Sequence, residues 1–183
     1  MNELFANDAA VNDLLILVDG RDEEIGQATK EQAHTQGLLH RAFSVVLRCE
    51  DGQGRQILLA QRAQGKYHSS GLWANSCCSH PRAGEQVLDA AYRRVPEELG
   101  CQARDLREIA GFIYRAEFDN GLCEYEYDHV LVGECVGTPD PDPSEVGDVR
   151  WVSEQDLAAE LAAHPERFSA WAFTVLSLVL AQD

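Results

Sequence analysis

The chain has 183 residues, of which 45% are hydrophobic and 25% charged, which suits a single domain over residues 1–183 with one core. Its 31 acidic and 15 basic residues give a formal net charge of −16. That balance argues against a nucleic-acid surface, and it means that an anionic substrate needs a local group of Lys and Arg or a metal ion.

The N-terminal residues lack the basic start and apolar run of a signal peptide, and the longest apolar run is too short and too broken to span a bilayer. We therefore expect a cytoplasmic protein that has no membrane partner and keeps its six cysteines reduced. We expect a monomer, with a dimer as the alternative.

The first elements are short apolar runs separated by turn residues. Residues 13–18 predict a strand that ends at the turn pair Asp19-Gly20, and a polar stretch follows it. Residues 42–48 and 56–60 are apolar runs on either side of a turn-rich segment, which predicts a β-hairpin.

Basic and histidine side chains flank this hairpin. Lys30, His34 and His40 precede it, and Arg62 and Lys66 follow it. Two nearby histidines are common on an ordinary surface as well as in a site, so their spacing alone does not choose between these interpretations.

The segment richest in reactive side chains comes next, after a loop at residues 67–71. Residues 75–81 read Asn-Ser-Cys-Cys-Ser-His-Pro and bring together thiols and an imidazole, which titrate or bind metal near neutral pH. A helix is predicted over residues 84–99, with Gly100 as its stop. Pro96 lacks the N–H of a helix interior, so we expect a kink or a tightened last turn. The predicted apolar face consists of Val87, Leu88, Ala91, Val95 and Leu99.

The C-terminal half begins with strands. Residues 107–118 and 124–132 predict a second hairpin across an Asp-Asn-Gly turn. A proline-rich acidic loop over residues 138–144 then leads to a short strand at residues 148–152.

Two helices complete the chain. Ser153 is the predicted N-cap of a helix that runs to about residue 163, and residues 168–180 predict an apolar helix that contains Trp171. Strands on both sides of one central helix, together with these helices, predict an α+β fold, a mixed α/β sandwich.

Glu124 and Glu126 are two residues apart, so a strand directs both to one face and Tyr125 to the other. A solvent-exposed face explains such a pair as well as a site does. The functional alternative is a pair of carboxylates that converges on a cation with three histidines. Five mixed nitrogen and oxygen ligands suit Zn²⁺ or Mn²⁺ better than Ca²⁺. The candidate ligands are His34, His40, His80, Glu124 and Glu126.

Lys30, Arg62, Lys66 and Arg94 are candidates for an anion pocket, because a phosphate site must use some of the few basic residues. Ordinary surface charge is the alternative for each. Cys78 is either an inert buried thiol or, beside a cation, a group that moves protons.

Two stretches of the sequence resemble the signatures of type 1 isopentenyl diphosphate isomerases. They are Trp73-Ala-Asn-Ser-Cys-Cys-Ser-His-Pro81 and Cys123-Glu124-Tyr-Glu126. Residues 82–101 also resemble a Nudix box, a helix–loop motif that this family shares with diphosphate hydrolases. The resemblance covers about residues 30–171 and implies a Nudix-like fold with mixed sheets packed between helices.

The box departs from the hydrolase pattern at two places. Ser79 stands where hydrolases carry their first glycine, and Arg93-Arg94 replaces Arg-Glu. The second change removes a metal-binding carboxylate, whereas a hydrolase needs several to hold Mg²⁺ and position water. The resemblance therefore implies an isomerase of isoprenoid biosynthesis that interconverts isopentenyl and dimethylallyl diphosphate through a tertiary carbocation.

The resemblance also implies a role for each matching residue. One divalent metal, Mn²⁺, Zn²⁺ or Mg²⁺, is bound by His34, His40, His80, Glu124 and Glu126. A Mg²⁺ that arrives with the diphosphate is bound by Glu98 and the Cys78 carbonyl. The diphosphate is held by Lys30, Arg62, Lys66 and Arg94. Cys78 and Glu126 transfer protons, Tyr114 assists Glu126, and Trp171 lies against the hydrocarbon.

Two other functions compete with the isomerase. A Nudix hydrolase of a nucleoside diphosphate derivative is consistent with Glu85, Arg93, Glu97 and Glu98, but Arg94 counts against it. A non-enzymatic domain with a structural metal ranks last, because the cysteines and His80 are too crowded for an ordinary zinc finger.

Overall fold

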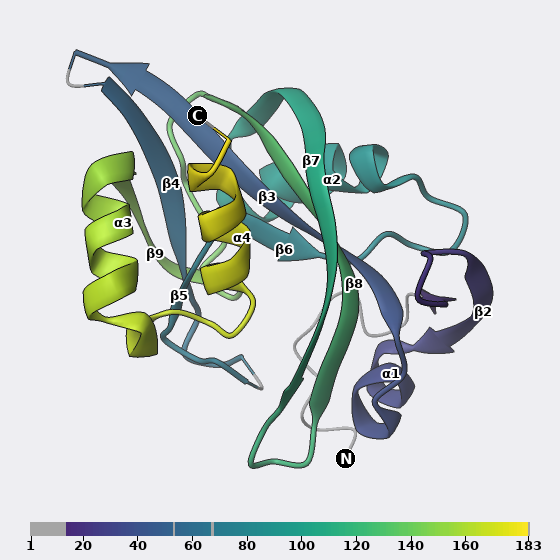
Figure 1. Cartoon of the computed structure of the whole chain (residues 1–183). Coiled ribbons are helices and arrows are strands. Elements are labelled where there is room, and N and C mark those ends of the chain that lie inside the picture. The colour runs from purple at the N-terminus through teal and green to yellow at the C-terminus, as the bar shows by residue number, and fades with distance from the viewer. Residues whose placement is uncertain (1–13, 53, 67, 183) are drawn as a thin grey trace.

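The computed structural model of the chain describes residues 14–52, 54–66 and 68–182. The first residue of the predicted N-terminal strand and of the loop at 67–71 lie outside these ranges. The elements are β1 (Leu14–Val18), β2 (Glu24–Thr29), α1 (Lys30–Gln36), β3 (His40–Asp51), β4 (Gly54–Arg62), β5 (Trp73–Ala74), β6 (Cys77–Ser79), α2 (Val87–Leu99), β7 (Gln102–Glu117), β8 (Cys123–Val136), β9 (Val146–Ser153), α3 (Glu154–Ala163), a 3₁₀ turn (Pro165–Arg167) and α4 (Ala172–Leu180) (Figure 1).

The described strands form one mixed sheet with β3 as its hub. β3 pairs antiparallel with β1, β4 and β6, and parallel with β8. β7 extends the sheet beyond β8, while β5 and β9 pair with β4. This sheet and its helices confirm the predicted α+β architecture, and both predicted hairpins form with longer strands than expected.

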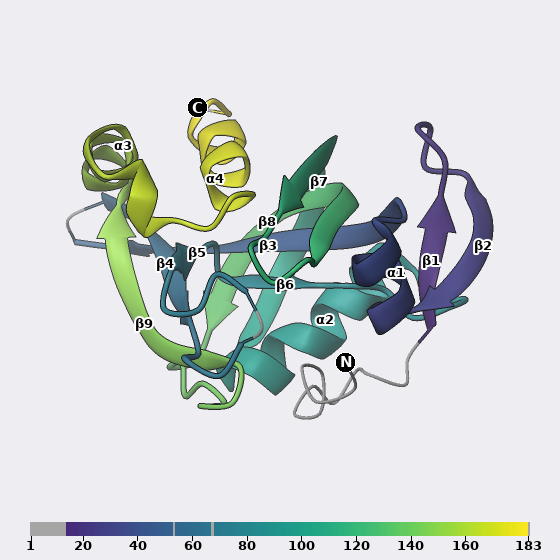
Figure 2. The same cartoon turned by 90° about the horizontal axis from the view of Figure 1, so that it is seen from below.

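Helices cover both faces of the sheet. α2 lies on one side, and α3 and α4 lie on the other (Figure 2). Successive residues of β3 therefore enter different cores: Val45 and Leu47 pack in the cluster that includes residues of α2, and Val46 packs in the cluster that includes residues of α3 and α4. Burial on both faces explains why β3 and β4 read as continuous apolar runs rather than alternating ones.

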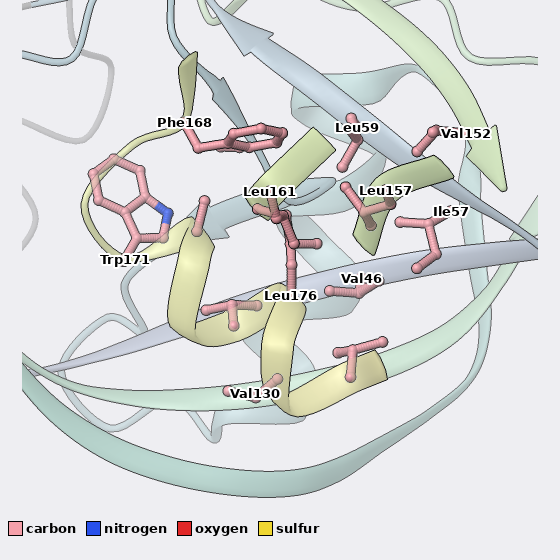
Figure 3. Packing of buried hydrophobic residues seen from close by; sticks show 14 of the residues in the cluster. Val46, Ile57, Leu59, Val130, Val152, Leu157, Leu161, Phe168, Trp171 and Leu176 are labelled. Atoms are coloured by element: carbon pink, nitrogen blue, oxygen red, sulfur yellow. The ribbon is translucent and has the colours of Figure 1, made fainter. Parts of the chain in front are cut away.

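The cluster beneath α3 and α4 reaches the candidate site. Figure 3 shows residues of this cluster, among them Leu161 of α3, Leu176 of α4 and Val46 of β3. Trp171 belongs to the same cluster and is only 4% exposed. The core therefore fixes the position of the Trp171 ring directly before α4.

α2 begins at Val87, three residues later than predicted, and ends at Leu99, where Gly100 forms the C-cap in the left-handed conformation with φ of 66°. Leu88, expected on the buried face, is 40% exposed. The Gly100 N–H donates to the Pro96 carbonyl at 3.1 Å, four residues back. This bond has α-helical spacing, so the last turn does not tighten there; a kink at Pro96 stays a prediction.

Three local expectations need correction. The polar stretch after Asp19-Gly20 forms β2, which pairs with β1, and it is followed by α1. α1 starts with a capping box in which the Thr29 side chain accepts from the Gln32 N–H, a signal that is present in the sequence. The last helix begins at Ala172 rather than residue 168. Over the part of the chain that the structure describes, no helix combines the length and hydropathy needed to cross a bilayer.

Candidate active site

Five side chains from four parts of the fold meet at one point. α1 carries His34, β3 begins with His40, His80 follows β6, and β8 carries two carboxylates. One ligand atom from each lies within 4.8 Å of all the others. The five are the predicted set: His34, His40, His80, Glu124 and Glu126. Both carboxylates are buried on the same face of β8, as the two-residue spacing predicts.

Backbone carbonyls fix the tautomers of two histidines. Nδ1 of His34 lies 2.6 Å from the Lys30 carbonyl oxygen, and Nδ1 of His40 lies 2.8 Å from that of Leu38. A carbonyl can only accept, so each Nδ1 carries a hydrogen that it donates. In the neutral rings, Nε2 therefore presents a lone pair to the cluster.

These lone pairs face carboxylate oxygens. Nε2 of His34 is 3.2 Å from Oε1 of Glu124, and Nε2 of His40 is 3.5 Å from Oε1 of Glu126. Among the described residues, His40 Nε2 and Glu124 Oε2 are buried without a hydrogen-bond partner. Acceptors that face one another without a hydrogen between them fit a cation, and this donor set suits a borderline divalent metal.

The protonation of the carboxyl and imidazole groups in this cluster also favours metal binding. Burial acts to raise the pKa of Glu124, but His34 and His68 outweigh it, so the pKa lies well below its usual value. The pKa of Glu126 is also lowered, against burial and the charge of Glu124, by the neighbouring imidazoles of His40 and His80. Burial lowers the pKa of His80 to about 4. Ionised carboxylates and a neutral imidazole are the forms that bind metal.

Next to this cluster, and within the described part of the chain, the Cys78 sulfur has three hydrogen-bond partners, of which the Ser44 hydroxyl is the most distant at 3.6 Å. The amide nitrogen of Asn75 donates to the carbonyls of Val45 and Cys77, both at 3.1 Å, which leaves its Oδ1 to accept from the Cys78 thiol at 3.1 Å. The Trp171 Nε1–H donates to the sulfur at 3.1 Å. Burial raises the pKa of Cys78 to about 12, so the thiol is neutral at physiological pH.

Cys78, Tyr114, Glu126 and Trp171 line one cavity. The Tyr114 hydroxyl donates to Oε2 of Glu126 at 2.5 Å, while Oε1 faces His80 at 2.8 Å. The carboxyl group is thus held from both sides. A thiol, a carboxylate and an indole face a common space, which is an arrangement that can add and remove protons on a small apolar molecule.

The four predicted anion-binding residues line the same cavity: Lys30, Arg62, Lys66 and Arg94. The Arg94 guanidinium lies 2.5 Å from Oε1 of Glu98, and Lys66 pairs with Glu145. The guanidinium carbon of Arg62 lies 5.2 Å from the Trp171 ring centroid. All the site residues expected from the sequence except His34 and His40 line this cavity, and those two histidines meet three of its lining residues in the His/Glu cluster.

Sequence reasoning missed several residues of the site. His68, which falls in the expected loop at 67–71, is buried, bonds to Glu124 and stacks on Phe118 with ring centroids 4.3 Å apart. No spacing in the sequence points to it. Asp128, in contrast, continues the alternation of Glu124 and Glu126 along β8. Its two-residue spacing from Glu126 could therefore have predicted from the sequence that it lies on the same face.

Comparison with known proteins places these features in context. A family model described as the NUDIX domain matches residues 38–172. The chain is 46% identical over 166 residues to an isopentenyl-diphosphate Delta-isomerase of Serratia proteamaculans, covering 91% of this chain and 90% of that protein. It is 48% identical over 174 residues to a protein of the same name from Photobacterium profundum, covering 93% and 96%.

Solved structures share the architecture. A protein from Deinococcus radiodurans has a TM-score of 0.69 at 22% identity, covering 90% of this chain and 98% of that chain. A MutT NUDIX hydrolase from Burkholderia pseudomallei has a TM-score of 0.61 at 20% identity, covering 77% and 98%. At identities this low the similarity concerns the fold alone, and the structural match confirms the expected Nudix-like fold.

Proposed function

Because this chain belongs to the isopentenyl-diphosphate Delta-isomerases of the NUDIX-domain family, we propose that Cys78 and Glu126 transfer the protons by which it interconverts isopentenyl and dimethylallyl diphosphate. The observation that carries this proposal is that the thiol of Cys78 and the carboxyl of Glu126 line one cavity. The reaction feeds isoprenoid biosynthesis, which needs both diphosphates.

The reaction moves a double bond by one carbon. A proton is added to the terminal carbon, the tertiary carbon becomes cationic, and a proton is then lost from the carbon on its other side. One group delivers the first proton and the other takes the second, so no redox cofactor is required. Tyr114 acts through Glu126, because its hydroxyl donates to Oε2 and limits the directions that the carboxyl group can adopt.

The cationic centre needs protection from water. Trp171 is 4% exposed, and its ring offers a π face to a passing carbocation. Its N–H is committed to the Cys78 sulfur, so the ring and the thiol keep a fixed relation. The reaction needs water kept from this centre, since water would otherwise trap the cation as an alcohol, and the buried indole is the part of the lining that we propose to do this.

Divalent metals complete the proposed site. A metal at the His/Glu cluster, which we propose to be Mn²⁺, Zn²⁺ or Mg²⁺, would hold the Glu126 carboxyl in place and tune its acidity. Glu98 and the backbone carbonyl of Cys78 are the proposed ligands of a Mg²⁺ that enters with the diphosphate. The proposed diphosphate contacts are Lys30, Arg62, Lys66 and Arg94, all of which line the cavity.

A hydrolase of nucleoside diphosphate derivatives is the less supported function. Arg94 occupies a position where a hydrolase would carry a carboxylate, and it bonds to Glu98 rather than leaving that carboxylate to a metal alone. The relatives with 46% and 48% identity carry the isomerase name.

Isotope incorporation tests the reaction. The protein is incubated with isopentenyl diphosphate and Mg²⁺ in deuterated water, and the dimethylallyl product is analysed by mass spectrometry. We expect deuterium in the product, because a proton from an exchangeable group is added to the alkene. Release of inorganic phosphate without isomerisation would instead support the hydrolase.

A substitution tests the assigned chemistry. Cys78→Ala removes the thiol and should lower isomerisation by about 10³-fold or more, given that a single acid–base group contributes about 10²–10⁴-fold. Cys135→Ala is the matched control, because Cys135 is also partly buried but lies outside the cavity. Near-normal turnover by Cys78→Ala would contradict the proposed role.

A further inference from the structure

Glu145 places a second carboxylate among the residues proposed to hold the diphosphate. Its carboxylate pairs with Lys66 and lies 3.7 Å from the Arg94 guanidinium. Its side chain is 14% exposed and lines the cavity together with Glu98. Nothing in the sequence pattern marked it, because it lies between the acidic loop and β9.

The backbone around Glu145 is firmly anchored. Its carbonyl accepts from the Ala63 N–H at 3.1 Å, and its N–H donates to the Asp142 carbonyl at 3.0 Å. The Asp142 N–H in turn donates to the Glu98 carbonyl at 2.9 Å, which ties this loop to the end of α2. The carboxylate is therefore mounted on fixed backbone, and we expect it to stay at the cavity when a ligand enters.

Basic and acidic side chains are equal in number around the cavity. Its lining includes four basic residues, Lys30, Arg62, Lys66 and Arg94, and four acidic residues, Glu98, Glu124, Glu126 and Glu145. A diphosphate that enters alone meets as much repulsion as attraction, in a chain whose net charge is already −16. Without the carboxylates, the basic side chains alone would attract the diphosphate.

We propose that Glu145, together with Glu98, makes diphosphate binding conditional on a divalent cation. Two carboxylates around one space offer the hard oxygen ligands that Mg²⁺ takes, directly or through water. When Mg²⁺ accompanies the diphosphate, both carboxylates would bind the metal and so favour diphosphate binding instead of opposing it. This inference rests on the proposed function, since it assigns Glu145 to the same diphosphate site as a positioning residue.

The test measures binding of inorganic diphosphate by calorimetry, with and without Mg²⁺. Wild-type protein should bind diphosphate poorly without Mg²⁺ and at least tenfold more tightly with it. Glu145→Gln removes one negative charge, so the metal-free affinity should rise about tenfold, as expected for a nearby charge pair worth about 1.4 kcal/mol. The enhancement by Mg²⁺ should shrink by a similar factor.

Two further variants make the result specific. Glu160→Gln is the matched control, because Glu160 is 17% exposed and pairs with Arg150 outside the cavity; it should leave both affinities unchanged. Glu145→Asp keeps the charge and should keep the metal dependence, and it serves if Glu145→Gln fails to fold. Thermal unfolding of each variant identifies such a failure.

Equal diphosphate affinities of Glu145→Gln and wild type, in both conditions, would overturn the inference, as would a loss of the Mg²⁺ effect in Glu145→Asp. Binding and isomerisation are scored separately. If wild type binds as described but shows no deuterium incorporation, the proposed function fails and the role of Glu145 stands. If wild type isomerises and Glu145→Gln behaves as wild type, only the role of Glu145 fails.

Discussion

At the scale of single residues, three carboxyl groups on one face of β8 have different surroundings. Histidines face Glu124 and Glu126 and lower their pKa values. Asp128 is 1% exposed, and among the described residues its one hydrogen bond is from the Ser44 hydroxyl at 2.8 Å. Burial, reinforced by the charge of Glu126, raises the pKa of Asp128 well above its usual value. The same strand therefore presents carboxyl groups whose pKa values are shifted in opposite directions.

Asp128→Asn tests this difference through the pH dependence of stability. The folded protein binds the Asp128 proton more tightly than the unfolded chain, so its stabilising contribution is complete below the unfolded pKa of about 3.9 and is lost as pH rises toward the folded value. The variant does not titrate there. Its free energy of unfolding relative to wild type should rise with pH, by up to about 1.4 kcal/mol per pH unit.

Urea denaturation between pH 5 and 9 measures this slope. Asp119→Asn is the control, because Asp119 lies at an exposed turn. A difference between Asp128→Asn and wild type that does not change with pH would contradict a raised pKa of Asp128.

The placement of single residues could be predicted where chemistry and spacing coincide, while their roles stay predictions. The Glu124–Glu126 spacing identifies a strand face, and the Cys78–His80 segment identifies itself by its composition. His68 and Glu145 were not predicted, because each reaches the site from a loop or the end of a loop. There, no periodicity relates a residue's place in the sequence to the direction of its side chain.

At the scale of elements, α2 and the loop after β8 position the diphosphate end of the cavity. α2 carries Arg94 and Glu98, and the Asp140 N–H bonds to the Leu99 carbonyl at 2.8 Å. The loop can approach this closely because Gly100 has no side chain: a Cβ there would lie 2.2 Å from the Asp140 carbonyl oxygen.

Gly100→Ala should therefore destabilise the protein by about 2–4 kcal/mol, from the left-handed backbone and from the displaced loop together. Gly84→Ala is the control: Gly84 also has positive φ, of 80°, but a Cβ would meet nothing within 4 Å. That variant should lose only about 1 kcal/mol. Equal losses in chemical denaturation would contradict the steric explanation.

Elements with strong patterns were predicted, and those without were not. Both long hairpins and the Ser153-capped helix follow from apolar runs, turn residues and a capping side chain. β2 and α1 were missed because β2 is polar and largely exposed and α1 spans only seven residues. Trp171 was placed inside the last helix because apolar residues continue across its start, where the chain instead turns to bring the indole to Cys78.

At the scale of the whole molecule, the hydrophobic clusters and the metal ligands are separate. The clusters lie between the sheet and the helices, and the five candidate ligands belong to neither cluster. The fold therefore does not depend on a metal for its core, unlike a small zinc-stabilised domain.

Removal of the metal by chelation should abolish the isomerase activity without unfolding the protein. We expect protein treated with EDTA to keep its far-UV circular dichroism and a cooperative thermal transition. Zn²⁺ or Mn²⁺ at about 100 times its dissociation constant should raise Tm by roughly 5–10 °C, because binding to the folded state adds about 2.7 kcal/mol. Unfolding by EDTA at room temperature would instead support a structural metal domain.

The sequence predicted the α+β class but not how distant segments pair. The parallel pairing of β3 with β8 places His40 directly beside Glu126. No local pattern specifies such a partner, because it depends on which of several apolar strands can occupy the centre of the sheet.

This pairing also bears on synthesis at the ribosome. β3 emerges early and β8 much later, so the chain waits through the whole of α2 and β7 before its central strand gains a parallel neighbour. Until then an apolar edge of β3 is open to intermolecular association, and a chain interrupted before Glu126 lacks part of the His/Glu cluster. Completion of that cluster and protection of this edge should thus occur in the same late folding event.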